Sequence, residues 1–139
     1  MPWGLRAVLS LQAEREDQFE GTPPERTLRL LVEDFQSPTL EQLQAAVAFV
    51  HAAHADGMPV LVHCHAGVGR ASLTVSAYLM THGLSHIEAF ARVKHARPIV
   101  ALTGGQLARL VEWEQHLHAS RAAAPAAPAP ASISMESPA

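Results

Sequence analysis

The chain has only one cysteine, Cys64, among its 139 residues. A single thiol excludes an intrachain disulfide and a zinc site built from several thiolates. A free thiol also suits a reducing compartment, so we expect a cytoplasmic protein. Most lone cysteines are small buried hydrophobic residues, and the surroundings of Cys64 must therefore decide whether it has a chemical role.

Charged residues are also scarce, at 17% of the sequence, and the formal net charge is −3. Proteins that bind nucleic acid in general are usually basic, so this balance argues against that class. No apolar run is long enough to span a membrane, and the first ten residues lack the apolar stretch of a signal peptide. We expect a monomer that has neither nucleic acid nor a membrane as its partner.

Hydrophobic residues make up 48% of the sequence, which is enough for the core of one domain. We assign this domain to residues 1–118. From about Ala119 the composition changes to Ala, Pro and Ser without periodicity, as in HASRAAAPAAPAPASISMESPA. Such a segment buries little apolar surface, so residues 119–139 are predicted to form a disordered tail.

Strands and helices alternate along the predicted domain. Short apolar runs predict strands at 7–11, 28–32 and 59–62, the last of which resembles a buried parallel strand. Helical spacing predicts helices that begin near residues 39, 71, 86 and 104. This alternation indicates an α/β fold, which we expect to be a three-layer sandwich with a mostly parallel central sheet flanked by helices.

Helix starts are marked by capping signals. The first helix has two candidate caps: Ser37 followed by Pro38, or a capping box formed by Thr39 and Gln42. The same Ser/Thr-x-x-Glu/Gln signature recurs further along the chain, at Ser85 with Glu88 and at Thr103 with Gln106.

The segment HCHAGVGR, residues 63–70, connects the third strand to the second helix. A loop between a buried strand and a helix N-terminus directs several backbone N–H groups to one point, where the helix end adds partial positive charge. Gly67 and Gly69 permit positive φ angles and a close approach of the backbone to an anion. Arg70 has a planar guanidinium that can hold two phosphate oxygens at once.

The positive field of such a loop would also stabilise the thiolate of Cys64. A free cysteine has a pKa of about 8.5, and helix N-termini and nearby cations lower it. His63 precedes the cysteine and is positioned to orient the loop or add positive character. The alternative is a buried structural cysteine beside a glycine turn, but such a turn needs no Arg70, whose buried charge would have to be paired. The sequence thus predicts a nucleophilic cysteine in an anion-binding loop.

The pattern His-Cys, five residues, Arg resembles the signature loop of the protein tyrosine and dual-specificity phosphatases. The segments LVEDFQSPTLEQL, AYLM and ARPIVALTGGQ are also similar to small members of this superfamily, so the resemblance covers about residues 7–117. It implies a protein tyrosine phosphatase-like fold and a phosphomonoester hydrolase that needs no cofactor. Its substrate would be a phosphorylated protein or a small phosphomonoester.

The resemblance also assigns roles to single residues. Cys64 would be the nucleophile that forms a phosphocysteine, Asp34 the general acid, and Gln106 a residue that positions water. Glu33 is a second candidate for the acid, and the capping box is an equally good explanation for Gln106. The phosphoryl oxygens would be bound by the loop and the arginine that follows it, that is His65, Ala66, Gly67, Val68, Gly69 and Arg70.

Two features depart from the superfamily pattern. Ala71 stands where its members usually have Ser or Thr, a hydroxyl that is thought to stabilise the leaving thiolate, so we expect slower turnover rather than weaker phosphate binding. Ser72 is next along the helix and should point elsewhere. Relatives also carry an extra strand or hairpin before the first strand of this chain, so we expect either a fold trimmed at its N-terminus or a longer protein that has lost its front. A trimmed sheet edge would lower stability and favour self-association.

Two other functions compete with an active phosphatase. One is a pseudophosphatase that binds phosphorylated ligands and turns over slowly, which the alanine after Arg70 would favour. The other is a rhodanese or arsenate reductase, which the upstream Asp34 and the lack of a second cysteine disfavour. We expect no metal site, because the remaining histidines are scattered over several helices: His51, His54, His82, His86, His95, His116 and His118.

Overall fold

The computed structural model describes residues 7–12, 24–33, 35–64, 69–121 and 133–136. Its elements are, in chain order, β1 (Ala7–Gln12), β2 (Arg26–Val32), α1 (Leu40–Ala55), β3 (Val60–His63), α2 (Arg70–Met80), α3 (His86–Ala96), α4 (Gly104–Arg121) and β4 (Ile133–Glu136). The three predicted strands and four predicted helices are all present, and the strand bounds and helix starts differ from the predicted ones by at most two residues.

The strands form one parallel sheet in the order β2-β1-β3-β4. Ser10 on β1 is in register with Arg29 on one side and with His63 on the other. Because the strands are parallel, the carboxyl ends of β2 and β3 lie at the same edge of the sheet. In α/β proteins this is the edge at which ligands bind.

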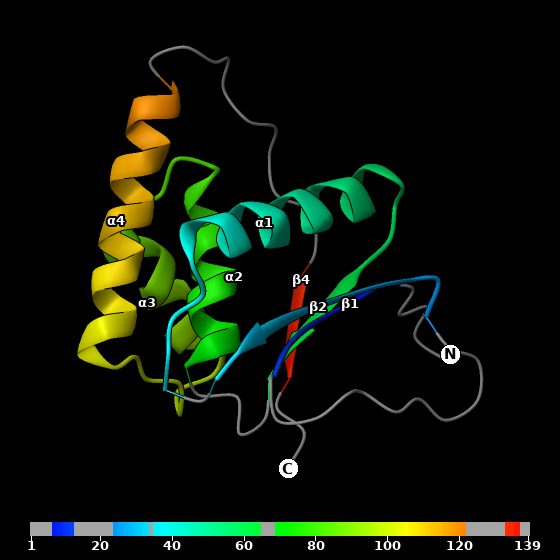
Figure 1. Cartoon of the computed structure of the whole chain (residues 1–139), viewed down its shortest axis with the longest axis horizontal. Coiled ribbons are helices and arrows are strands. Elements are labelled where there is room, and N and C mark those ends of the chain that lie inside the picture. Colours follow the sequence, from blue (N-terminus) through cyan, green and yellow to red (C-terminus); the bar gives the residue numbers. More distant parts are fainter. Residues whose placement is uncertain (1–6, 13–23, 34, 65–68, 122–132, 137–139) are drawn as a thin grey trace.

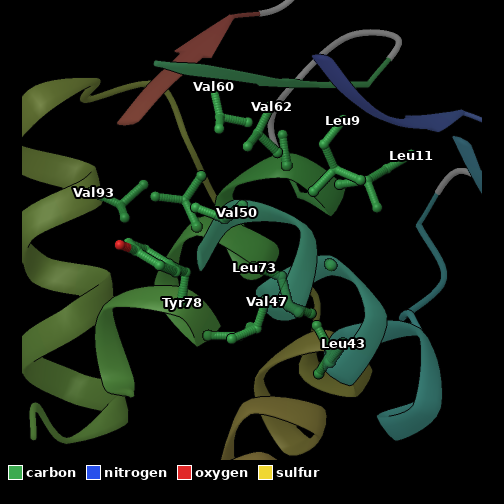
Figure 2. Close-up of a cluster of buried hydrophobic side chains, with 14 of the residues drawn as sticks. Leu9, Leu11, Leu43, Val47, Val50, Val60, Val62, Leu73, Tyr78 and Val93 are labelled. Carbon is green, nitrogen blue, oxygen red and sulfur yellow. The ribbon is translucent and has the colours of Figure 1, made fainter. Parts of the chain in front are cut away.

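Helices α1 and α2 lie against the sheet (Figure 1), and the core between these layers continues to α3 and α4 through Ala89, Val93, Leu110 and Trp113. Alternate residues of β1 and β3 point toward α1 and α2, as Figure 2 shows for Leu9, Leu11, Val60 and Val62. Within the described residues, α3 and α4 pack mainly on α2, so the layers run from the sheet through α1 and α2 to α3 and α4. This arrangement confirms the α/β class with a parallel sheet.

Helix α2 is buried along its whole length, with only Leu79 partly exposed. Its polar side chains bond to carbonyl groups of the preceding turn, so burying them leaves no donor unsatisfied: Ser72 to Gly69, Thr74 to Arg70 and Ser76 to Ser72, at 2.8–3.0 Å. The indole of Trp113 on α4 donates to the carbonyl of Ala77 at 3.0 Å. Helix α2 is therefore the structural centre of the helical layers.

Capping boxes start three of the helices. At α1 the cap is Thr39 with Gln42, which decides between the two candidates in the sequence. The box predicted for Ser85 and Glu88 starts α3. The third box, at the start of α4, is part of the candidate site and is described with it.

Part of the predicted disordered tail is ordered. Helix α4 continues to Arg121, where the guanidinium donates to the carbonyl of Met80 at 2.6 Å and so satisfies the end of α2. Strand β4 pairs with β3 in parallel, from Val60 with Ile133 to His63 with Glu136. The prediction was wrong for these residues because the partners that order them are distant in sequence; 122–132 and 137–139 lie outside the described residues.

Within the described part of the chain, no helix combines the length and apolar character needed to cross a bilayer. No group of three or more histidine, cysteine or acidic residues there is arranged to hold a metal ion.

Candidate active site

The two predicted catalytic positions that the structure describes lie at the carboxyl edge of the sheet. Cys64 follows β3 directly and has only 1% of its surface exposed. Arg70 is the first residue of α2 and is also 1% exposed. His63, the last residue of β3, is buried as well. The predicted loop residues His65, Ala66, Gly67 and Val68 lie outside the described residues, as does Asp34.

Helix α2 begins without a side-chain cap. Its N-cap is Gly69, which has no side chain to bond to the first N–H groups, and none of the described side chains caps them in its place. Unsatisfied N–H groups at a helix start carry partial positive charge and attract anions. Together with the adjacent guanidinium of Arg70, this end of α2 is suited to holding a phosphoryl group and to stabilising a thiolate.

The guanidinium of Arg70 contacts the end of β2. Its Nη1 donates a hydrogen bond of 2.7 Å to the carbonyl oxygen of Val32, the last residue of that strand. Burying a guanidinium is unfavourable unless it is hydrogen-bonded, so this bond contributes to holding the side chain in place. It also links the start of α2 to the segment that carries both candidate acids.

That segment, residues 33–36, forms a tight turn that we call the acid loop. The N–H of Gln36 donates to the carbonyl of Glu33 at 3.0 Å. Phe35 has a φ of 64°, a left-handed conformation that is uncommon for residues other than glycine, and its side chain is 66% exposed. Glu33 is also exposed. A carboxylate in this loop follows β2 at the same sheet edge as Cys64.

Gln106 is 1% exposed and has several partners. Its Oε1 accepts from the N–H of Thr103 at 3.0 Å, and its own N–H donates to Thr103 Oγ1 at 3.1 Å, which completes the predicted capping box. Its Nε2 donates to the carbonyl of Gln36 in the acid loop at 3.0 Å. The sequence left two roles open for Gln106, in a capping box or in positioning water, and the bonds of the capping box are present.

Gly69 is needed for space rather than for an unusual backbone angle. Its φ is −123°, which any residue can adopt. A Cβ at this position would lie 2.6 Å from Oε1 and 2.7 Å from Nε2 of Gln106. The side-chain amide of Gln106 therefore packs directly on the backbone at the end of the signature loop.

Neither Ala71 nor Ser72 supplies the hydroxyl that superfamily members usually have directly after the arginine. Ala71 is fully buried in the core. The hydroxyl of Ser72 donates to the carbonyl of Gly69 at 3.0 Å and is also buried. Ser72 is therefore engaged with the backbone of its own helix, as expected for a side chain that points elsewhere.

Two features of the site were not predicted. One is the pair of backbone carbonyls, of Val32 and Gln36, that receive bonds from Arg70 and Gln106. Backbone acceptors have no sequence signature, so nothing in the residue pattern pointed to them. The other is β4 beside β3, although its Ile-Ser-Met-Glu sequence is the one apolar-alternating stretch of the tail.

The chain is similar in sequence and in fold to known phosphatases. Mouse dual specificity phosphatase 28 is 35% identical over 119 residues, which cover 83% of this chain and 73% of that protein. Human dual specificity protein phosphatase 12 is 34% identical over 119 residues, and the chain spans only 34% of its length. The crystal structure of PTPMT1 in complex with PI(5)P superimposes with a TM-score of 0.78 at 30% identity, covering 88% of this chain and 84% of the other. This similarity confirms the expected protein tyrosine phosphatase-like fold.

The profile of the dual specificity phosphatase catalytic domain matches residues 3–116. The matched region runs from before β1 to near the end of α4, and so includes the sheet edge, the signature loop and the acid loop. The chain therefore belongs to the dual specificity phosphatase family and contains its catalytic domain.

Proposed function

We propose that the chain is a cysteine-dependent phosphomonoester hydrolase of the protein tyrosine and dual-specificity type. The observation that carries the proposal is the pair formed by Cys64 and Arg70: both are buried, and they flank one loop between β3 and the uncapped start of α2. A nucleophile beside an anion-binding helix end is what a phosphoryl transfer requires.

The reaction proceeds in two steps. The thiolate of Cys64 attacks phosphorus, the S–P bond forms, and the P–O bond to the leaving group breaks while Asp34 donates a proton to the departing oxygen. The same carboxylate then accepts a proton from water, which attacks the phosphocysteine and releases inorganic phosphate and the thiolate. Arg70 and the amides of the loop from His65 to Gly69 bind the phosphoryl oxygens in both steps, with His63 as a supporting residue.

The substrate is a phosphorylated protein or a small phosphomonoester. The names of the relatives cover protein phosphatases and, in human phosphatidylglycerophosphatase and protein-tyrosine phosphatase 1, a lipid phosphatase. A single free cysteine suits a reducing compartment, which supports a cytoplasmic location. That the protein is cytoplasmic and monomeric is part of the proposal.

The first test is hydrolysis of para-nitrophenyl phosphate by the wild-type protein and by Cys64→Ser between pH 5 and pH 8. We expect turnover in the wild type and a loss of about 10⁴-fold or more in the variant, because the serine hydroxyl is a much weaker nucleophile. Mass spectrometry of acid-quenched protein should detect a phosphate adduct on Cys64 in the wild type. Accumulation of this adduct would mean that, with alanine at position 71, the second step is slow.

Other outcomes distinguish the alternatives. Equal turnover in the wild type and Cys64→Ser would contradict a cysteine mechanism. If the wild type shows neither turnover nor an adduct but still binds vanadate, a phosphate-binding pseudophosphatase module becomes the better description. Circular dichroism of both proteins controls for misfolding.

A further inference from the structure

Two buried side chains hold the acid loop at its two ends. Arg70 donates to the carbonyl of Val32, just before the loop, at 2.7 Å. Gln106 donates to the carbonyl of Gln36, the last residue of the loop, at 3.0 Å. Both donors are 1% exposed, so these bonds form in a poorly hydrated environment where a hydrogen bond is electrostatically strong and an unpaired polar group is unfavourable.

Gln106 also contacts the signature loop. Its amide lies so close to Gly69 that a methyl group there would be 2.6–3.0 Å from three of its atoms. The same amide oxygen accepts the N–H of Thr103 and so is fixed to the start of α4. One side chain therefore touches the acid loop, the end of the signature loop and α4.

The acid loop needs such support because its conformation is strained. Phe35 has a φ of 64°, and its exposed ring contributes little burial to stabilise this angle. Residues in sparsely populated conformations persist only where the surrounding structure holds them. Within the loop, the bond from Gln36 to Glu33 closes the turn, and the bond from Gln106 fixes the closed turn to the rest of the domain.

We infer that Gln106 is a positioning residue that fixes the acid loop against the signature loop, so that the general acid is held in place for proton transfer to the leaving group. The inference rests on the proposed function, since it concerns the acid of that reaction. It differs from a role in positioning water, because the amide is already engaged with Thr103 and Gln36.

The leaving group makes the inference testable. A para-nitrophenolate leaves readily without a proton, whereas the phenolate of phenyl phosphate needs protonation much more. Loss of the bond to Gln36 should therefore impair hydrolysis of phenyl phosphate more than hydrolysis of para-nitrophenyl phosphate. A purely structural loss would lower both rates by the same factor.

The experiment compares Gln106→Met with a matched control, Glu88→Met. Both residues occupy the same position in a capping box, but Glu88 is exposed and caps α3 without any described contact to the acid loop. In Gln106→Met we expect kcat/KM for phenyl phosphate, which reports the first step alone, to fall about 10- to 100-fold, as for a misplaced catalytic group. The kcat/KM for para-nitrophenyl phosphate should change less than about threefold. The decrease of kcat/KM for phenyl phosphate at basic pH should become shallower.

A second variant separates the two bonds of the amide. Gln106→Glu retains an oxygen for the capping box and loses the donor to the carbonyl of Gln36. It should show the same selective loss with phenyl phosphate while α4 keeps its cap. In the control Glu88→Met, both substrates should change by the same factor.

Hydrogen exchange at residues 33–38 provides a readout that is independent of activity. Exchange there should be faster in Gln106→Met than in the wild type and unchanged in Glu88→Met. Equal losses for both substrates in Gln106→Met, or exchange that stays at the wild-type rate, would overturn the inference. A wild type that hydrolyses neither substrate would instead contradict the proposed function, and the exchange measurement would still test whether Gln106 holds the loop.

Discussion

At the scale of single residues, the identity of the general acid is open between two adjacent residues. Glu33 and Asp34 are adjacent in the sequence, so two carboxyl groups compete for the same role. Asp34→Asn should lower kcat for phenyl phosphate by about 10²–10⁴-fold, the usual contribution of a positioned acid, and should remove the basic limb of its pH profile. Glu33→Gln is the matched control and should leave both the rate and the profile nearly unchanged.

A reversed result, in which Glu33→Gln loses the basic limb and Asp34→Asn keeps it, would reassign the acid to Glu33. Both variants keep the size and shape of the side chain and remove its charge and its titratable proton. Circular dichroism and the rate with para-nitrophenyl phosphate provide the check.

At the scale of secondary-structure elements, the C-terminal halves of α1 and α2 bring several aromatic and imidazole rings together. His51 Nε2 lies 3.2 Å from Thr81 Oγ1, and its ring centroid is 4.9 Å from that of Tyr78 and 5.5 Å from that of His82. His54 Nδ1 lies 2.9 Å from the hydroxyl of Tyr78. Burial lowers the pKa of His51 from its ordinary value of 6.5, and the charges of His82 and His54 lower it further.

This lowered pKa predicts how stability depends on pH. Because His51 binds a proton less readily in the folded protein than in the unfolded chain, its contribution to the free energy of unfolding is full above about pH 6.5 and is lost as the pH falls below that value. Urea unfolding at pH 7.5 and pH 5.5 should show the loss. In His51→Gln, which cannot be protonated, the decrease should be smaller; an identical decrease would contradict the role of His51.

The titration of Glu114 does not interfere in this pH range. The pKa of Glu114 is lowered, first by the hydrogen bond from the backbone N–H of His86 and then by the side chain and charge of that histidine. Stability from such a group is present above the unfolded pKa of about 4.5 and is lost only at more acidic pH. The pH window of the experiment therefore separates the titration of His51 from that of Glu114.

The elements also show how far the sequence could predict this molecule. Local signals located them well, because capping boxes and apolar runs are encoded by the residues that form them: Thr39 with Gln42 fixed the start of α1, and the apolar run before His63 marked β3. The order of the elements around HCHAGVGR placed Cys64 and Arg70 together. What local patterns do not encode is a partner distant in sequence, such as Gln36 for Gln106 or β3 for β4.

At the scale of the whole molecule, β4 covers the outer edge of β3. An exposed parallel strand presents unpaired N–H and C=O groups to other chains, and the pairing of β4 along Val60 to His63 satisfies this edge within the chain. The self-association that the sequence suggested for an open edge is therefore opposed by the C-terminal strand.

Deletion of residues 133–139 tests this role. Loss of the β4 hydrogen bonds should lower the free energy of unfolding by about 1–3 kcal/mol. It should also expose the edge of β3, so that the truncated protein associates at high concentration, as measured by analytical ultracentrifugation. Deletion of 137–139 alone is the control. A truncated protein that unfolds at the wild-type temperature and stays monomeric would show that β4 does not protect the edge.

The burial of Arg70 has a consequence for the entropy of ligand binding. A free arginine side chain samples many rotamers, and fixing it costs up to about 2 kcal/mol at room temperature. In this protein the guanidinium is already held by the carbonyl of Val32 and enclosed at the start of α2. That ordering takes place when the chain folds. If Arg70 holds the phosphoryl group as proposed, little of its rotamer freedom remains to be lost on binding, and more of the interaction energy appears as affinity.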